Sequence, residues 1–454
     1  MEKSAEMRLF EMALSMLADK NGRLLQPVID DMRGRDNPVV IINMACDGPD
    51  AGINTFIAAN RIDETAAGIA ALAETCKCSE IIIYSGGAEA VGAAKTAAKT
   101  EAIPAKEPGA EETATEKIAA AVKQQTSVPV KAMTGPESPV LRDETALFSA
   151  MDTGISRVNR AEQEYYSSFL SYGYQGRPTL VVDGEAAYQA GRLYMDPAAK
   201  KTKLVSLGCG AQIIEVQCGT SIAELLDDNT TGATAQIVQI GGINGSFKDV
   251  ETLKDTRIEF SYEYDSVWVP GSGDCVINRL AGIYETIKEL SCTKCVLCRE
   301  GSRQLSAIFS DMTEGRSNRD DIALIEDICP IINVGALCEF GKNMVIPALT
   351  AVVVCRDAFE NHIIKKSCPA GLCKGLLNYV IDPALCTGCG DCIDVCPEDA
   401  IDGKDGFIHI IDGKLCEKCG KCADACGDGA IKLDSGSIKT PRKPVRVGSF
   451  QRGD

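Results

Sequence analysis

The chain has 454 residues, of which 45% are hydrophobic and 24% are charged, the composition of a globular protein with about three or four domains. Its formal net charge of −17 argues against nucleic acid as the main partner. We expect neither a signal peptide nor a transmembrane segment, because residues 1–20 form a charged amphipathic pattern and Pro347 breaks the longest apolar run. Twenty-two cysteines without an export signal predict metal binding in a reducing, anaerobic cytoplasm.

Residues 1–195 alternate strand-like and helix-like segments, which predicts an α/β domain with a parallel sheet. We expect strands at 38–43, 80–84 and 126–130, an Ala-rich helix over 62–76, and a surface loop at 107–112. Ligands of such sheets bind at the carboxyl ends of the strands, so the turn after Asn43 is the first place to look for a cofactor.

Residues 196–272 are predicted to form a small β-rich module. Strand-like runs lie at 203–207, 212–216, 235–240 and 257–260, and a helix over 221–226 begins at Thr220 or Ser221. Cys209 and Cys218 lie on neighbouring predicted strands, and we interpret them as small buried apolar residues and not as ligands.

Residues 273–375 are predicted to form a helical iron–sulfur domain. A C-x2-C-x2-C triplet supplies three thiolates of a [4Fe–4S] cluster, and Cys338 supplies the fourth. Amphipathic helices over 304–312 and 320–332 would return Cys338 to the triplet. The ligands of this cluster are therefore predicted to be Cys292, Cys295, Cys298 and Cys338.

A second metal site is indicated by the array His362-x5-Cys368-x4-Cys373. A tetrahedral zinc site needs one ligand more than these three. The alternative is a histidine at a helix end beside a CPAGLC turn. Cys329 and Cys355 lie on apolar helix faces and are interpreted as core residues.

Residues 376–437 contain two C-x2-C-x2-C-x3-C runs with identical spacing, the pattern of bacterial two-cluster ferredoxins. In that pattern the fourth cysteine of each run crosses to the other cluster. We therefore assign one [4Fe–4S] cluster to Cys386, Cys389, Cys392 and Cys426, and the other to Cys416, Cys419, Cys422 and Cys396. Zinc knuckles or a disulfide framework are the alternatives. His409 is expected to be exposed, and residues 438–454 form a basic tail that is either solvated or docks on an acidic subunit.

The order of these segments resembles the NADH-oxidising subunit of respiratory complex I (NuoF type). It resembles more closely the HydB-type subunits of electron-bifurcating hydrogenases and transhydrogenases, which add a C-terminal ferredoxin domain. The matching motifs are RDETAL at 142–147, GRPTLVVDGE at 176–185, SCTKCVLCREG at 291–301 and ALCEFG at 336–341. The resemblance implies a β-grasp (SLBB-like) fold for residues 196–272. It also implies Cys275 as the fourth zinc ligand, with Cys355 as the alternative.

The chain departs from this family at the flavin site. The family's glycine-rich FMN loop, GRGGAGFPTG, is replaced by NGRLLQPVIDDMRGRDN at 21–37. Leu24, Leu25 and Pro27 cannot copy the close approach of glycine amides to a phosphate and a flavin ring. The degenerate FMN and NADH positions are Asp47, Glu144 and Asp183. We expect no tightly bound FMN, and the alternative is an intact flavin site in unfamiliar sequence.

Together these features predict an electron-transfer subunit of a multi-subunit oxidoreductase, with three [4Fe–4S] clusters, one zinc ion and no catalytic residues of its own. Its partners would be flavin or iron–sulfur subunits and ferredoxin. The alternative is an enzyme, an FMN-containing subunit that oxidises NAD(P)H. A third possibility is a structural zinc adaptor without iron.

Overall fold

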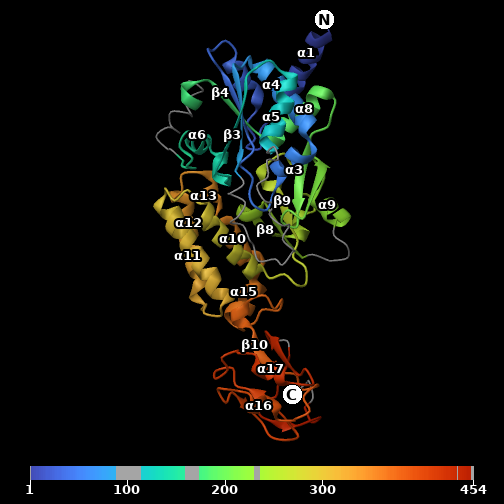
Figure 1. The fold of residues 1–454 in the computed structure, drawn as a ribbon, viewed down its shortest axis with the longest axis vertical. Coiled ribbons are helices and arrows are strands. Elements are labelled where there is room, and N and C mark those ends of the chain that lie inside the picture. Colours follow the sequence, from blue (N-terminus) through green and yellow to red (C-terminus); the bar gives the residue numbers. More distant parts are fainter. Residues whose placement is uncertain (1, 88–113, 159–172, 230–235, 437, 451–454) are drawn as a thin grey trace. The chain divides into compact units, whose positions relative to one another are not determined.

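The computed structural model describes residues 2–87, 114–158, 173–229, 236–436 and 438–450. The predicted loop at 107–112 lies outside these residues. The chain divides into two compact units (Figure 1). The first unit contains residues 1–269, 282–305 and 325–354, and the second contains residues 270–281, 306–324 and 355–454.

The first unit is built on a four-stranded parallel sheet with the strand order β3-β2-β1-β4. Its strands are β1 (Val39–Asn43), β2 (Glu80–Gly86), β3 (Val130–Gly135) and β4 (Thr179–Asp183). Every residue of β1 and β4 is buried, which explains why β1 reads as an unbroken apolar run. The third predicted strand is present, but it runs over Val130–Gly135 and not over 126–130. Residues 126–129 instead form the turn that follows α5 (Ala114–Gln125), and Pro129 has no amide for a strand ladder.

Helices pack against this sheet to form the main core. They are α1 (Glu2–Leu14), α2 (Leu25–Met32), α3 (Ile53–Asn60), α4 (Ile62–Cys76), α5, α6 (Glu144–Thr153) and α8 (Gly184–Met195). The bounds of α4 agree with the predicted helix. Helices α4 and α8 run side by side (Figure 1). A Cβ atom at Gly68 would collide with the carbonyl of Ala187, and one at Gly191 with the carbonyl of Glu64. Glycine at these two positions therefore permits the close contact.

A second sheet in the first unit has the order β6-β5-β9-β7-β8. Its elements are β5 (Thr202–Leu207), β6 (Gln212–Gln217), α9 (Ile222–Asn229), β7 (Ile237–Ile240), β8 (Ser246–Asp249) and β9 (Ser266–Trp268). The strand predicted at 257–260 is wrong, since only an isolated bridge between Arg257 and Ser221 forms there. The short strands β8 and β9 complete the sheet in its place.

Ser221 begins α9 through a reciprocal cap. The amide of Glu224 donates to Ser221 Oγ at 3.1 Å, and the Ser221 amide donates to Glu224 Oε2 at 3.0 Å. Cys209 lies in the turn after β5 with φ 59°, and Cys218 follows β6. Both are half-buried, so the prediction that they are buried on strands is wrong.

The helical region contains α10 (Val276–Leu290), α11 (Val296–Thr313), α12 (Asp320–Gly335), α13 (Glu339–Asn343), α14 (Ile346–Val354) and α15 (Arg356–Ile363). The helices predicted at 304–312 and 320–332 lie within α11 and α12. Within the first unit, the Tyr284 hydroxyl donates to the carbonyl of Met344 at 2.9 Å and accepts from the amide of Ala348 at 3.1 Å. This buried pair of hydrogen bonds joins α10 to the start of α14. No helix among the described residues combines the length and apolarity that a membrane span requires.

The second unit includes a small antiparallel domain with two similar halves. Its elements are β10 (Asn378–Ile381), α16 (Asp391–Asp394), β11 (Ile401–Asp402), β12 (Phe407–Ile408), β13 (Ile410–Ile411), α17 (Lys421–Ala425), β14 (Ile431–Asp434) and β15 (Val445–Arg446). Strand β10 pairs with β14, β11 with β13, and β12 with β15. Since β15 belongs to the predicted basic tail and Phe450 packs on the core of this domain, this part of the tail is not a free solvated end.

Candidate metal centres and cofactor cavity

The first group of cysteines lies in the first unit. Cys292 and Cys295 lie in the loop before α11, Cys298 lies in its first turn, and Cys338 is the N-cap of α13. The Cys338 sulfur accepts a hydrogen bond from the Gly341 amide at 3.5 Å. A Cβ atom at position 341 would lie 3.3 Å from the Cys298 sulfur, so a glycine there lets α13 approach the triplet.

The pKa values of Cys338 and Cys298 are affected by the other cysteines of this group. Burial, with a contribution from negative charge on Cys292 and Cys298, raises the pKa of Cys338 to about 12. Burial also raises the pKa of Cys298, with contributions from Cys295 and Cys292. Two buried thiols that are costly to ionise without a cation, together with two further cysteines of the same group, can hold an iron–sulfur cluster.

The small antiparallel domain contains two cysteine-lined cavities. Each holds three cysteines of one run and the last cysteine of the other. The first is lined by Cys386, Cys389, Cys392 and Cys426, and the second by Cys416, Cys419, Cys422 and Cys396. Backbone amides point at the two crossing sulfurs in the same way. Ala400 donates to Cys396 Sγ and Ala430 donates to Cys426 Sγ, both at 3.3 Å.

His409 lies in the first of these cavities. It is only 2% exposed, so the prediction that it is exposed is wrong. Burial lowers the pKa of His409, against the opposing effect of Asp405 and Asp402. The spacing within one cysteine run gives no signal for this contact, because His409 lies beside the other run.

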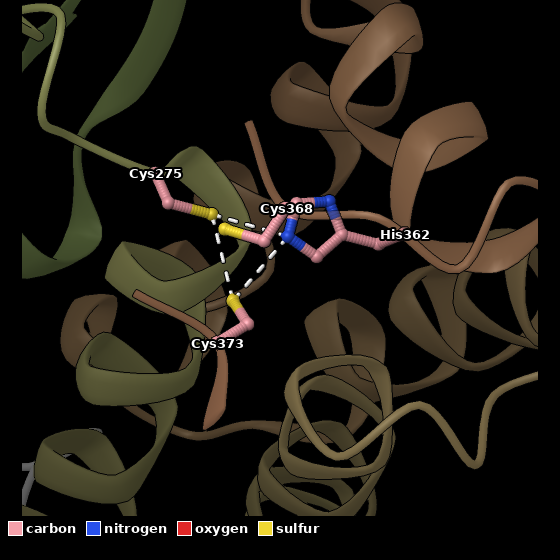
Figure 2. A group of neighbouring side chains, drawn as sticks. All are labelled: Cys275, His362, Cys368 and Cys373. Carbon is pink, nitrogen blue, oxygen red and sulfur yellow. Dashed lines mark hydrogen bonds between the residues drawn. The ribbon is translucent and has the colours of Figure 1, made fainter. Parts of the chain in front are cut away.

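The candidate zinc ligands converge in the second unit. Cys275 precedes α10, His362 lies in the last turn of α15, and two cysteines lie in the loop that follows, so that the group is Cys275, His362, Cys368 and Cys373 (Figure 2). All four are buried, and their ligand atoms lie within 4.8 Å of one another. Cys355 is not part of this group.

The distances fit a tetrahedral ion. Cys275 Sγ lies 3.3 Å from His362 Nε2 and 3.7 Å from Cys373 Sγ, and His362 Nε2 lies 3.3 Å from Cys373 Sγ (Figure 2). With zinc–sulfur bonds of about 2.3 Å and zinc–nitrogen bonds of about 2.0 Å, ligand atoms of a tetrahedral site lie about 3.5–3.8 Å apart. Three thiolates and one imidazole with this spacing can hold zinc in a closed site.

A hydrogen bond to the backbone fixes the orientation of the His362 ring for metal binding. His362 Nδ1 lies 2.7 Å from the carbonyl of Ala358, one turn earlier in α15. A carbonyl only accepts, so Nδ1 carries the proton and the lone pair of Nε2 is available to a metal ion held among the three sulfurs. Without a metal ion, burial lowers the pKa of His362, but hydrogen bonds with Cys275 and Cys368 more than offset this and raise it to about 10.

Two of the three predicted flavin positions, Asp47 and Asp183, lie near the same side chain, that of Lys20. Asp47 accepts hydrogen bonds from the amide of Asn54 at 2.6 Å and from its Nδ2 at 3.0 Å. Asp183 is the N-cap of α8 and accepts from the Ala186 amide at 3.0 Å. Both carboxylates are buried, and burial raises the pKa of each, that of Asp47 to about 6. Glu144 instead pairs with Arg23 at 2.7 Å.

A buried ion network, which sequence reasoning missed, lies beside Asp47 and Asp183. Lys20 Nζ lies 2.9 Å from Asp265 and 3.2 Å from Glu185, and Lys203 Nζ lies 2.8 Å from both. Lys20 is 3% exposed and Lys203 is 0% exposed. The guanidinium group of Arg142 is the third cation that acts on the Asp265 carboxylate. These cations lower the pKa of Asp265 although burial alone would raise it. The scattered positions of these residues carry no motif in the sequence.

A cavity of about 1010 Å³ opens next to this network. Its lining includes Lys20, Arg142, Glu144, Tyr262 and Cys338. Small-molecule sites occupy roughly 300–1,000 Å³, so this cavity has room for a nucleotide-sized ligand. Of the three predicted flavin positions, Glu144 lines it, and Asp47 and Asp183 do not.

The chain is similar to known proteins over its iron–sulfur segments. Residues 278–362 match the NADH-ubiquinone oxidoreductase-F iron-sulfur binding region, and residues 379–402 match a 4Fe-4S binding domain. The NADP-reducing hydrogenase subunit HndC of Solidesulfovibrio fructosivorans is 31% identical over 294 residues, covering 58% of each chain. The NuoF-type subunit of the NADH-quinone oxidoreductase of Streptomyces coelicolor is 24% identical over 193 residues, covering 40% of each chain.

The chain is homologous to NuoF-type subunits and carries a ferredoxin domain. The match over residues 278–362 includes Cys292, Cys295, Cys298 and Cys338, and it also includes His362. The match over residues 379–402 includes the cysteine run from Cys386 to Cys396. The chain spans about 58% of the length of HndC.

The fold is also similar to that of a solved structure. A crystal structure of an NAD+-reducing [NiFe]-hydrogenase in the H2-reduced state superposes with a TM-score of 0.63 at 16% identity, covering 79% of this chain and 63% of the other. At this identity the likeness concerns the fold alone. The chain thus combines a parallel-sheet α/β region, a helical segment that matches an iron–sulfur binding region, and a ferredoxin-like segment.

Proposed function

We propose that this NuoF-type chain is an electron-transfer subunit of a multi-subunit, anaerobic, cytoplasmic oxidoreductase related to NADH dehydrogenases and bifurcating hydrogenases. It relays single electrons through three [4Fe–4S] clusters and binds no flavin. The observation that carries the proposal is the convergence of three sets of four cysteines, each assembled from two separate segments. The partners are other iron–sulfur or flavin subunits, and ferredoxin.

The ligands of the first cluster are Cys292, Cys295, Cys298 and Cys338. The ferredoxin clusters take the two crossed sets that line the small cavities, and zinc takes Cys275, His362, Cys368 and Cys373. We place the domain boundaries at 195, 272, 375 and 437. Iron–sulfur clusters supply reversible one-electron chemistry when bound. The chain's own contribution is to bury at least one ligand of each cluster, and to aim amides such as those of Gly341, Ala400 and Ala430 at the sulfurs.

The zinc site has a structural role in this proposal. A zinc ion with four protein ligands has no open position for a substrate. Its loop is tied to the ferredoxin segment of the same unit, because Ser435 Oγ donates to the carbonyl of Cys368 and Ser367 Oγ donates to the carbonyl of Ser435. Zinc would therefore hold α15 and the segment that leads into β10.

The absence of flavin is supported by the replaced FMN loop. Residues 25–32 form helix α2, whose Leu25, Val28, Ile29 and Met32 are buried in the core. The Leu25 amide donates to the carbonyl of Leu17, and Pro27 has no amide, so neither residue offers an amide to a phosphate. Asp47 and Asp183 are likewise engaged with Asn54 and Ala186.

Metal and flavin content of the anaerobically purified protein tests the proposal. Three clusters predict about twelve irons per chain, and the tetrahedral site predicts about one zinc, with little FMN. Stoichiometric FMN would contradict the flavin-free version. A zinc-rich protein without iron would contradict the electron-transfer role altogether.

A second candidate function is supported by the 1010 Å³ cavity that reaches Cys338. In this version the chain is an FMN-containing subunit that oxidises NAD(P)H. Lys20 and Arg142 would face the anionic ligand, because both line the cavity. Their ammonium and guanidinium groups lie 4.6 and 3.9 Å from the centre of the Tyr262 ring. NADH-dependent viologen reduction after reconstitution with FMN would support this candidate, and failure to reduce viologen would exclude it.

A further inference from the structure

Two side chains occupy equivalent places in the halves of the ferredoxin domain. Tyr379 precedes Cys386, the first cysteine of its run, by seven residues, and His409 precedes Cys416 by the same number. Each lines the cavity of the opposite run. Tyr379 lies in the cavity of Cys416, Cys419, Cys422 and Cys396, and His409 lies in that of Cys386, Cys389, Cys392 and Cys426. The two cavities are thus alike in their cysteines and differ at this position. They also differ at a second one, where Glu417 corresponds to Thr387.

His409 is held so that one ring nitrogen faces a sulfur. Its Nδ1 lies 4.0 Å from Cys386 Sγ, at the outer limit of an N–H···S hydrogen bond. The ring packs on Gly403, where a Cβ atom would collide with it, so only glycine lets the ring lie in this position. Nε2 has no hydrogen-bond partner in the described part of the chain, and the side chain is 2% exposed.

Tyr379 offers no equivalent donor to a sulfur. Its hydroxyl faces the backbone at Gly420, where an added Cβ atom would lie 2.9 Å from it. No hydrogen bond from Tyr379 to a cysteine occurs among the described residues.

We propose that His409 donates a hydrogen bond from Nδ1 to the Cys386 thiolate and so makes the two ferredoxin clusters unequal, with the cluster of Cys386 at the higher reduction potential. The proposal rests on the ligand sets of the proposed function. An iron-bound thiolate only accepts hydrogen bonds, so the nitrogen that faces it carries the proton. One-electron reduction adds negative charge to the cluster and strengthens this bond, which stabilises the reduced state. His409 is a positioning residue and not a ligand.

Variants of the full chain distinguish the effect of the hydrogen bond on the cluster potential from the effect of side-chain packing. His409→Leu removes the donor, and His409→Asn is smaller than histidine but keeps an N–H group near the position of Nδ1. Tyr379→Phe is the matched control at the equivalent place in the other half. Iron content is measured first, because loss of the clusters from the parent protein would overturn the proposed function and not this inference alone.

Potentials are then measured by redox titration monitored by electron paramagnetic resonance. We expect His409→Leu to lower the potential of one cluster and leave the other unchanged, with His409→Asn close to the parent and Tyr379→Phe without effect on the higher-potential cluster. Equal shifts in the Leu and Asn variants, or no shift in the Leu variant, would overturn the inference. If the His409→Leu variant does not bind iron, a spectroscopic measurement on protein that retains His409 tests the inference instead.

The chain has only two histidines, which permits this direct test. Incorporation of 15N-histidine into a His362→Cys variant, which keeps four zinc ligands, labels His409 alone. Pulsed electron paramagnetic resonance of the reduced protein should then show a 15N coupling on one cluster. Absence of a histidine nitrogen coupling on any cluster would overturn the inference.

Discussion

The Cys275 sulfur lies 3.3 Å from Nε2 of His362, although 87 residues separate the two along the chain. Helix α15 presents the histidine, and the start of α10 presents the cysteine, whose sulfur also accepts from the Asn278 amide at 3.4 Å. This closure of a long loop is what a structural zinc ion stabilises most effectively.

Removing Cys275 should therefore empty the zinc site. We expect Cys275→Ala to lower the zinc content from about one per chain to near zero and to lower the melting temperature, because zinc binding contributes about 10–16 kcal/mol in small structural sites. Cys355→Ala is the control, since this thiol is buried in the same unit and lies outside the ligand group. Full zinc retention by Cys275→Ala would remove Cys275 from the site.

The crossed ligand sets can be tested with double variants. Cys396→Ser and Cys419→Ser should each remove one cluster, or about four irons. Because both residues line the same cavity, the double variant should lose no more iron than either single variant.

Cys426→Ser combined with Cys419→Ser should instead lose about eight irons, since these residues line different cavities. Uncrossed runs predict the opposite result for the two pairs. Iron analysis after gel filtration under anaerobic conditions distinguishes the two arrangements.

Asp47 should make stability depend on pH. Its folded pKa is raised from 3.8 to about 6, so its contribution favours folding fully below the unfolded value of 3.8 and is lost as the pH rises through 6. Asp47→Asn cannot ionise, and an amide oxygen still accepts from Asn54. Relative to the parent, we expect this variant to gain roughly 1–2 kcal/mol of stability between pH 5 and pH 8. Denaturation curves of both proteins at the two pH values check this, and a constant difference would contradict it.

Lys203 should be the most costly cation to remove. It is fully buried between Glu185 and Asp265, so Lys203→Met would leave these carboxylates short of positive charge, and we expect a loss of about 3–5 kcal/mol. Lys248→Met is the control, because its pair with Glu263 is partly exposed and should contribute less than about 1 kcal/mol. Chemical denaturation compares the two. A similar loss of stability in both variants would show that burial does not make Lys203 more costly to remove than Lys248.

Features encoded by local spacing could be predicted, and features set by long-range packing could not. The cysteine runs and the helix over 62–76 follow from residues close together in sequence. The strand expected at 257–260 did not form, because β8 and β9 took the available places in the sheet, and three- or four-residue strands carry little periodicity.

The candidate sites follow the same rule. The position of Cys275 beside His362 was suggested only by a family resemblance, since 87 residues separate them. The burial of His409 depends on how the two halves of the ferredoxin domain exchange neighbours. The Lys20 network has no signal at all in the sequence, because its charges become partners only when the α/β region and the five-stranded sheet pack together.

The pairing of β15 with β12 has a practical consequence for work on this protein. Strand β12 ends at Ile408, directly before His409, and its partner lies at Val445–Arg446. Phe450 also packs on the same core. A truncation that removes residues 445–450 would therefore disturb the segment that holds His409, and these residues should be kept in any variant used to measure cluster potentials.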